Sequence, residues 1–131
     1  MSAPDNLKYS PAHHWVKKEP DGTVAVGITF HAQEALGDIV FVQNPEPGRR
    51  FKQGEACGVI ESVKTAADLY SPVAGDVTAV NTEAADKPER INTDPYGTWL
   101  FRLKPEHPAE LDALLDAAAY RKIAAAEPDG R

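Results

Sequence analysis

The sequence has little cysteine, no long apolar run and no cluster of basic residues. Its single cysteine, Cys57, excludes an internal disulfide and a Cys-x-x-Cys pair, so redox chemistry would have to come from a bound group. No apolar segment approaches the roughly 18 residues that a membrane-spanning helix needs. The 14 Lys and Arg against 20 Asp and Glu give a net charge of −6, without the basic stripe of a nucleic-acid binder. We therefore expect neither a nucleic-acid partner nor a membrane partner.

We also expect no targeting segment in the first residues. Residues 1–15 contain no apolar core and mix acids with bases, unlike a signal peptide or an Arg-rich transit peptide. We therefore expect a cytoplasmic protein of the bacterial type. The chain of 131 residues, 42% hydrophobic and 26% charged, has ordinary globular composition. This predicts one monomeric domain over residues 1–131, with a core at about 7–120 and a flexible tail at 127–131.

Short β-branched segments separated by Pro and Gly fill the first hundred residues. An Asp21-Gly22 turn precedes a Val-rich segment, which is typical of a hairpin. Similar segments follow at 38–43, 55–63 and 98–103. Many short strands at this spacing predict a small antiparallel β barrel or sandwich.

Two segments predict helices instead. Residues 29–38 have helical composition and stop at Gly37, a residue suited to end a helix. From Pro108 onward, an apolar stripe at helical spacing predicts one C-terminal helix, formed by Leu111, Leu114, Leu115 and Ala118.

Lys64 lies at the centre of a nearly symmetric stretch. Gly54 precedes it by ten residues and Gly75 follows it by eleven, with a strand-like segment on each side. The small and polar residues 64–68 between these segments predict a tight hairpin turn. Most hairpin lysines are merely solvated. A lysine at the tip of a rigid hairpin is also what a modifying enzyme needs, because the amine must enter another active site.

Several ordered motifs resemble the H protein family of the glycine cleavage system, which carries lipoate on a lysine. Glu61–Lys64, Asp68 and Ser71–Gly75 look like the lipoyl-lysine motif. The likeness extends over about residues 7–120, through the segments VGIT (26–29), AQEALGDIVFV (32–42), PEPG (45–48), VN (80–81), N-x-DPYG (92–97) and LLDAAAY (114–120).

The resemblance implies a mostly β fold with peripheral helices, a flattened barrel-sandwich hybrid with lipoate in amide linkage to Lys64. It implies that Glu61, Ser62 and Val63 are read by the lipoate-attaching enzymes. It also implies a non-catalytic carrier of the aminomethyl group of glycine. The partners would be a pyridoxal-phosphate glycine decarboxylase, a tetrahydrofolate-dependent aminomethyltransferase and a dihydrolipoyl dehydrogenase.

Family members hold the loaded arm in a surface cleft with polar and acidic groups. Asp68 matches one such acid, although it is equally compatible with a role in the turn. The usual family motif Ser-His-Glu-Trp is replaced here by Ala12-His13-His14-Trp15, so His14 stands where an acid is expected. The histidines lack the spacing of a metal site, and we expect no bound metal.

Three other interpretations remain open at this point. An H-like protein outside glycine cleavage, acting as a lipoate relay or as a scaffold for sulfur oxidation, would have the same hairpin. Biotin carriers share the hairpin too, but they typically place methionines around their lysine, where this chain has Val63 and Thr65. An interaction subunit with an unmodified lysine is the third.

Overall fold

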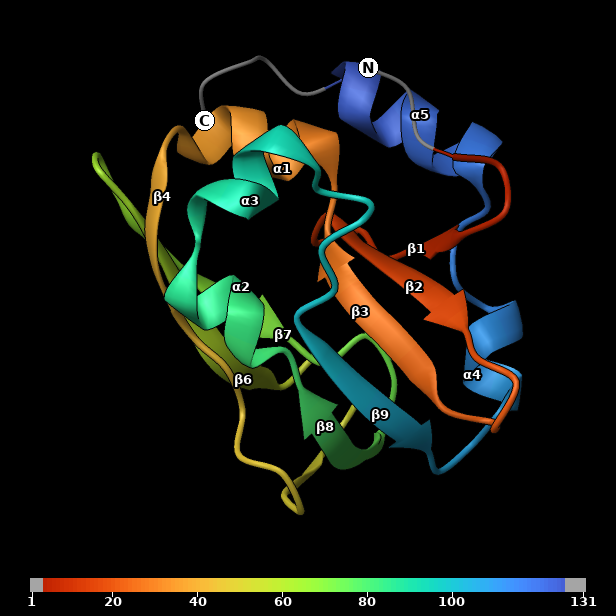
Figure 1. The fold of residues 1–131 in the computed structure, drawn as a ribbon. Helices are drawn as coiled ribbons and strands as arrows, with labels where there is room; N and C mark the ends of the chain where they lie inside the picture. Colours follow the sequence, from red (N-terminus) through yellow and green to blue (C-terminus); the bar gives the residue numbers. More distant parts are fainter. Residues whose placement is uncertain (1–3, 127–131) are drawn as a thin grey trace.

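Two antiparallel sheets form the centre of the protein in the computed structural model, which describes residues 4–126 (Figure 1). The larger sheet has the order β1-β2-β3-β9-β8-β5. Its strands are β1 (Lys8–Tyr9), β2 (His14–Lys18), β3 (Val24–Ile28), β5 (Arg50–Phe51), β8 (Gly75–Val80) and β9 (Phe101–Pro105). The smaller sheet has the order β4-β6-β7. It contains β4 (Ile39–Gln43), β6 (Ala56–Ser62) and β7 (Ala66–Tyr70). This arrangement confirms the predicted mostly β class.

The main core combines apolar side chains from both sheets. Several of these side chains are completely buried: Val24 and Val26 of β3, Phe101 and Leu103 of β9, and Leu69 of β7. In β6 and β7 the buried residues alternate with exposed ones, because one face of this sheet covers the core and the other meets solvent. The outer face therefore displays its side chains freely.

The short internal helix was predicted correctly and is α1 (Phe30–Leu36). The Thr29 hydroxyl accepts a hydrogen bond from the backbone N–H of Ala32 at 3.2 Å and so caps the first turn. Gly37 has a positive φ of 85°, a conformation that glycine adopts without a steric penalty, and its N–H donates to the Gln33 carbonyl.

The single C-terminal helix predicted from Pro108 onward is wrong. The structure has α4 (Ala109–Asp112) and α5 (Ala117–Ala126), separated by residues 113–116. Leu115 lies in this break, where its backbone exchanges two hydrogen bonds of 2.8 Å with Tyr9. Pairing with β1 therefore interrupts the helix, although the apolar spacing would allow it to continue. The predicted flexible tail, 127–131, lies outside the described residues.

Two short helices were not predicted. They are α2 (Thr82–Asp86) and α3 (Glu89–Thr93), which connect β8 to β9 beside β4 (Figure 1). The Asn81 carboxamide caps α2 by accepting from the Glu83 N–H at 3.1 Å. Each helix has five residues, too few to give a periodic apolar pattern in the sequence.

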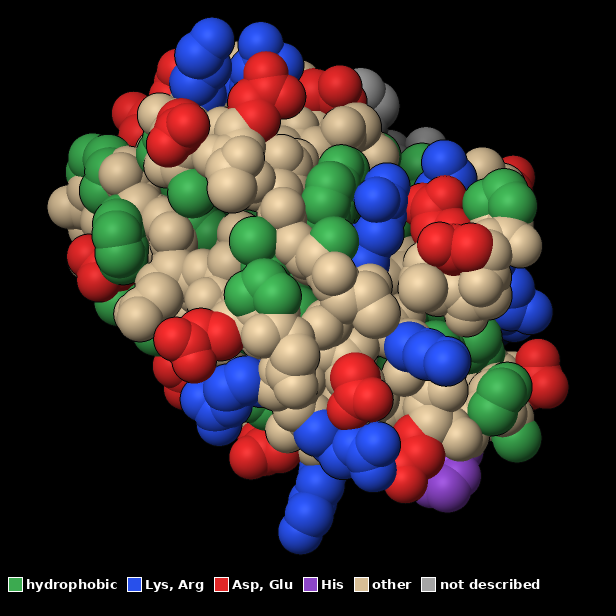
Figure 2. Space-filling view, turned by 60° about the horizontal axis from the view of Figure 1, so that its bottom comes forward, with side chains coloured by type: hydrophobic (Ala, Val, Ile, Leu, Met, Phe, Trp, Pro, Cys, Tyr) green, Lys and Arg blue, Asp and Glu red, His purple; other side chains and the backbone are tan. Residues whose placement is uncertain are grey.

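The surface is mixed in charge. On the face shown in Figure 2, basic and acidic side chains are interspersed. Within residues 4–126, no helix is long and apolar enough to cross a membrane.

Candidate functional site

Lys64 occupies the tip of the β6–β7 hairpin, which projects at the left edge of the molecule in Figure 1. β6 ends at Ser62 and β7 begins at Ala66, so Val63, Lys64 and Thr65 form the connection. The Lys64 side chain is exposed and extends past the end of α1: a Cβ added to Gly37 would lie 3.5 Å from Lys64 Cε. The amine is therefore displayed beside the body of the protein, at the predicted position.

The Ser62 side chain organises this tip. Its hydroxyl oxygen accepts hydrogen bonds from the backbone N–H groups of Lys64 at 3.3 Å and Thr65 at 3.2 Å. The Ser62 N–H donates to the Thr65 carbonyl at 2.7 Å, which closes the turn. A short hydroxyl that accepts from the next residues is a common way to fix a turn. Ser62 therefore fixes the backbone conformation of Lys64, the residue that carries the amine.

A second set of hydrogen bonds fixes the tip to the body. The Val63 N–H donates to the Asp38 carbonyl at 3.0 Å. The neighbouring Ile39 N–H donates to the Asn92 side-chain oxygen at 2.8 Å, and the Asn92 amide donates to the Gly37 carbonyl at 2.9 Å. Asn92 thus connects α3, the end of α1 and the start of β4 directly behind the tip. No local signal in the sequence assigns Asn92 this role, since its partners are more than 50 residues away.

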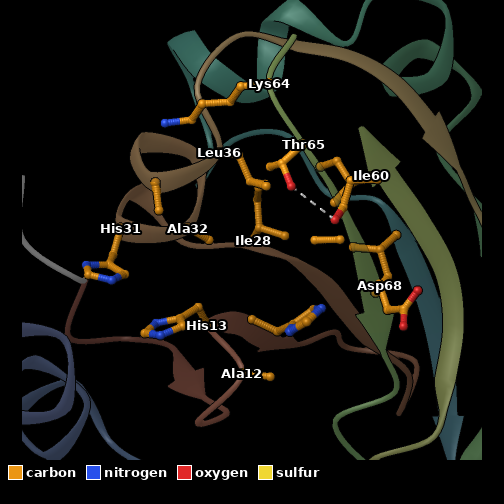
Figure 3. Close-up of a pocket in the computed structure, with 15 residues that line it drawn as sticks. Ala12, His13, Ile28, His31, Ala32, Leu36, Ile60, Lys64, Thr65 and Asp68 are labelled. Atoms are coloured by element: carbon orange, nitrogen blue, oxygen red, sulfur yellow. Dashed lines mark hydrogen bonds between the residues drawn. The ribbon is translucent and has the colours of Figure 1, made fainter. Parts of the chain in front are cut away.

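A cavity of about 410 Å³ lies between the hairpin, α1 and β2 (Figure 3). Most of its lining is small or apolar, from Ile28, Ala32, Ala35, Leu36, Ile60, Ala66, Ala67 and Leu69. Lys64 lines it too, and in Figure 3 its stem extends across the top of the cavity toward α1. A chain attached to the Lys64 amine therefore has an adjacent apolar cleft.

Asp68 is the one acidic residue that lines this cavity within the described chain. It lies on β7, across the cavity from His13 and His31 in Figure 3. Its side chain is exposed, and within residues 4–126 its carboxylate has no hydrogen-bond partner. The turn is fixed by Ser62 instead, so the carboxylate remains available to a ligand.

His14 lines the same cavity but is uncharged at neutral pH. It is 3% exposed, and burial lowers its pKa from the ordinary 6.5 to about 4, against the opposite effect of the Ala12 backbone. Its Nε2 accepts a hydrogen bond from the Tyr70 N–H at 3.3 Å, so the ring connects β2 to β7. His14 is therefore neither a carboxylate nor a cation, and the cavity wall contains a neutral polar group at this point.

The comparisons with known proteins agree with this geometry. The family model described as glycine cleavage H-protein matches residues 7–127. The chain belongs to this family. It is 57% identical to the glycine cleavage system H protein of Nitrosospira multiformis, over 97% of this chain and 98% of that protein. It is 56% identical to the one from Thiobacillus denitrificans, with the same coverage of both chains.

A solved structure extends the likeness to three dimensions. The crystal structure of a glycine cleavage system H protein from Mycobacterium marinum superposes with a TM-score of 0.84 at 44% identity, covering 92% of this chain and 97% of that one. The resemblance seen in the sequence and the barrel-sandwich fold are thereby confirmed. As an H protein, the chain is a lipoyl-carrier component of the glycine cleavage system. No finding favours a lipoate relay or a sulfur-oxidation scaffold.

Two other potentially reactive side chains of this H protein, Cys57 and His13, take part in the packing and hydrogen bonding of the fold. Burial raises the pKa of the Cys57 thiol to about 12, so it stays protonated in the core. His13 stacks on His31 with ring centroids 4.5 Å apart, and its Nδ1 shares a hydrogen bond of 2.7 Å with the Tyr120 hydroxyl. Within residues 4–126, no three His, Cys, Asp or Glu side chains are grouped as a metal site.

Proposed function

We propose that this H protein carries lipoate in amide linkage to Lys64 and transfers the aminomethyl group of glycine between enzymes. The observation that supports this most is the position of Lys64, at the tip of a hairpin fixed by Ser62 and Asn92 and beside an apolar cavity. A rigid base and a long flexible arm allow one group to visit several active sites. We also propose that the carrier unit is one domain, with its core at 7–120.

The cavity fits the chemistry of such an arm. Its apolar lining suits a hydrocarbon chain and a disulfide ring, and Asp68 adds one carboxylate near the hairpin. Bound lipoate would supply the sulfur chemistry that carries the one-carbon unit and accepts electrons. The protein would supply attachment at Lys64, a protected resting place and orientation.

We assign the reading of the attachment site to Glu61, Ser62 and Val63. Val63 and Glu61 project from the outer face, where an enzyme can contact them, whereas Ser62 points inward and sets the turn. The Ser62 contribution is therefore indirect: it holds the Lys64 backbone in the presented conformation.

We assign Asp68 and His14 to the arm cleft. Asp68 is the carboxylate placed to pair with the ammonium of a loaded arm. Neutral His14 does not repel that ammonium, but it contributes no opposite charge. The cleft would consequently hold the charged arm through one carboxylate.

The proposed partners are glycine decarboxylase, which loads the arm, aminomethyltransferase, which unloads it, and dihydrolipoyl dehydrogenase, which reoxidises it. A reconstituted assay tests this proposal. The lipoylated protein should accept the aminomethyl group from glycine decarboxylase, with carbon dioxide released, and should support tetrahydrofolate-dependent ammonia release. Failure of the fully lipoylated protein to accept the group would refute the pathway.

A further inference from the structure

Large apolar side chains are exposed next to Lys64 on the outer face of the β4-β6-β7 sheet. We define the tip patch as Val40, Phe41 and Val63, which are 53%, 46% and 70% exposed. Val63 lies next to the start of β4, because its N–H donates to the carbonyl of Asp38, the residue before this strand, at 3.0 Å. Phe41 lies opposite Glu61, two residues before Val63. The patch therefore continues directly from the hairpin tip onto β4.

A local irregularity of β4 creates this exposure. The register shifts between Ile39 and Phe41, so Val40 is an extra residue between two buried positions, Ile39 and Val42. A bulge of this kind turns two consecutive side chains to the same side of a strand. The patch does not line the cavity under Lys64. It is therefore separate from the cleft in which a carried arm would rest.

The charged residues that adjoin the tip patch along β4 and the β6–β7 hairpin are acidic, apart from Lys64. Glu61 faces Phe41 across the strands, and Asp38 adjoins the start of β4. The chain has no other Lys or Arg between Lys52 and Lys87, and none from residue 19 to residue 48. An apolar centre with an acidic border fits a partner that has an apolar groove bordered by Lys or Arg.

We propose that the tip patch is the docking surface for the enzyme that acylates Lys64. This inference rests on the proposed function, because it requires Lys64 to be the attachment site. The unmodified lysine has only a four-carbon stem, so an enzyme that acylates its amine must contact the tip itself. Enzymes that act on the end of the finished arm can bind farther away. Attachment should therefore depend on the patch more than any later step does.

The reaction at this surface is an acyl transfer from an activated lipoyl group, such as an acyl adenylate. The deprotonated Lys64 Nζ attacks the acyl carbon and a C–N amide bond forms. The C–O bond between the acyl carbon and the phosphate breaks and AMP leaves; one of the two Nζ protons passes to a base and the other stays on the amide nitrogen. The patch takes no part in this chemistry: it contributes binding, so its loss should raise KM and leave kcat nearly unchanged.

The test compares Phe41→Ala with Gln43→Ala. Gln43 is exposed, lies on the same strand and pairs with Val59, but it is polar and farther from the tip. Purified apo protein is incubated with lipoate ligase, ATP and lipoate, and the lipoylated fraction is followed by intact mass. Loss of an aromatic anchor should lower kcat/KM about tenfold through KM, and Gln43→Ala should stay within about twofold. Val63→Ser, at a more exposed position, repeats the test if Phe41→Ala melts below the assay temperature.

Three outcomes decide the inference. The inference is supported if Phe41→Ala and Val63→Ser raise the KM for lipoate attachment and Gln43→Ala does not. The lipoylated Phe41→Ala and Val63→Ser proteins should then still accept the aminomethyl group at nearly wild-type rates. Equal kinetics of Phe41→Ala, Val63→Ser and Gln43→Ala overturn it, as does slower aminomethyl transfer with normal attachment, which would assign the patch to a later partner. A wild-type protein that is never lipoylated at Lys64 would instead refute the proposed function.

Discussion

The side chain of Ser62 gives a direct test of how the hairpin presents Lys64. Ser62→Ala removes the acceptor of two backbone N–H groups, from Lys64 at 3.3 Å and Thr65 at 3.2 Å. It also removes the hydroxyl that donates to the Thr65 carbonyl at 3.3 Å, but that carbonyl keeps the bond of 2.7 Å from the Ser62 N–H. Both distances are at the long end of the N–H···O range, and both residues are exposed, so water can replace the lost acceptor. We take about 0.5 kcal/mol for each bond, the lower end of the usual net value. The tip should lose about 1 kcal/mol in total.

Amide hydrogen exchange measures this loss at the tip. A change of about 1 kcal/mol corresponds to about fivefold in the opening equilibrium, so the Lys64 and Thr65 amides of Ser62→Ala should exchange about fivefold faster. The rate of lipoylation should fall by no more than that factor. Thr65→Ala is the matched control, because its hydroxyl contacts just the adjacent Ala66 carbonyl, at 3.5 Å. Unchanged exchange in Ser62→Ala, or an equal effect of Thr65→Ala, would refute the reasoning.

Three further predictions concern the site and its support. Gly75→Ala should lower the free energy of unfolding in urea by about 3 kcal/mol, because the new Cβ would overlap with the Lys104 carbonyl oxygen. Gly54→Ala, with open space but a φ of +82°, should cost about 1 kcal/mol, and equal costs would contradict the steric explanation. Acidification should destabilise wild type more than His14→Gln, because His14 takes up a proton below pH 6.5 in the unfolded chain and only near pH 4 in the folded protein. Urea unfolding at several pH values should show a difference in stability that grows by up to about 1.4 kcal/mol per pH unit between these values. Parallel curves for the two proteins would argue against a buried neutral ring. Asp68→Asn should shorten the lifetime of the loaded arm about two- to fivefold, as measured by ammonia release from the isolated loaded protein. Glu46→Gln changes an exposed acid outside the cavity and should leave this lifetime unchanged. The same lifetime in both variants would show that Asp68 does not hold the arm in the cleft.

The parts of the fold that were predicted are those with strong local signals. The strands around Lys64, the helix ended by Gly37 and the hairpin turn each depend on residues close together in the sequence. The prediction of a single C-terminal helix failed because the break in this helix depends on a contact between residues far apart in the sequence. Leu115 pairs with Tyr9, more than 100 residues away, and the apolar spacing contains no information about that bridge.

The candidate site likewise has a part that the sequence predicts and a part that it does not. Lys64 could be located from the symmetry of its flanking segments and from the family motifs around it. The cavity could not, since it combines β2, α1 and the hairpin, and the neutrality of His14 depends on its burial between β2 and β7. The tip patch depends on a bulge at Val40, and a run of β-branched residues does not reveal where a strand bulges.

The intact mass of the protein purified from its native host tests the central claim most directly. The account predicts one added lipoyl group, located on the peptide that contains Lys64 and absent from Lys64→Ala. A lipoyl group that persists in Lys64→Ala, or a native protein that carries none under conditions in which glycine is being cleaved, would contradict it.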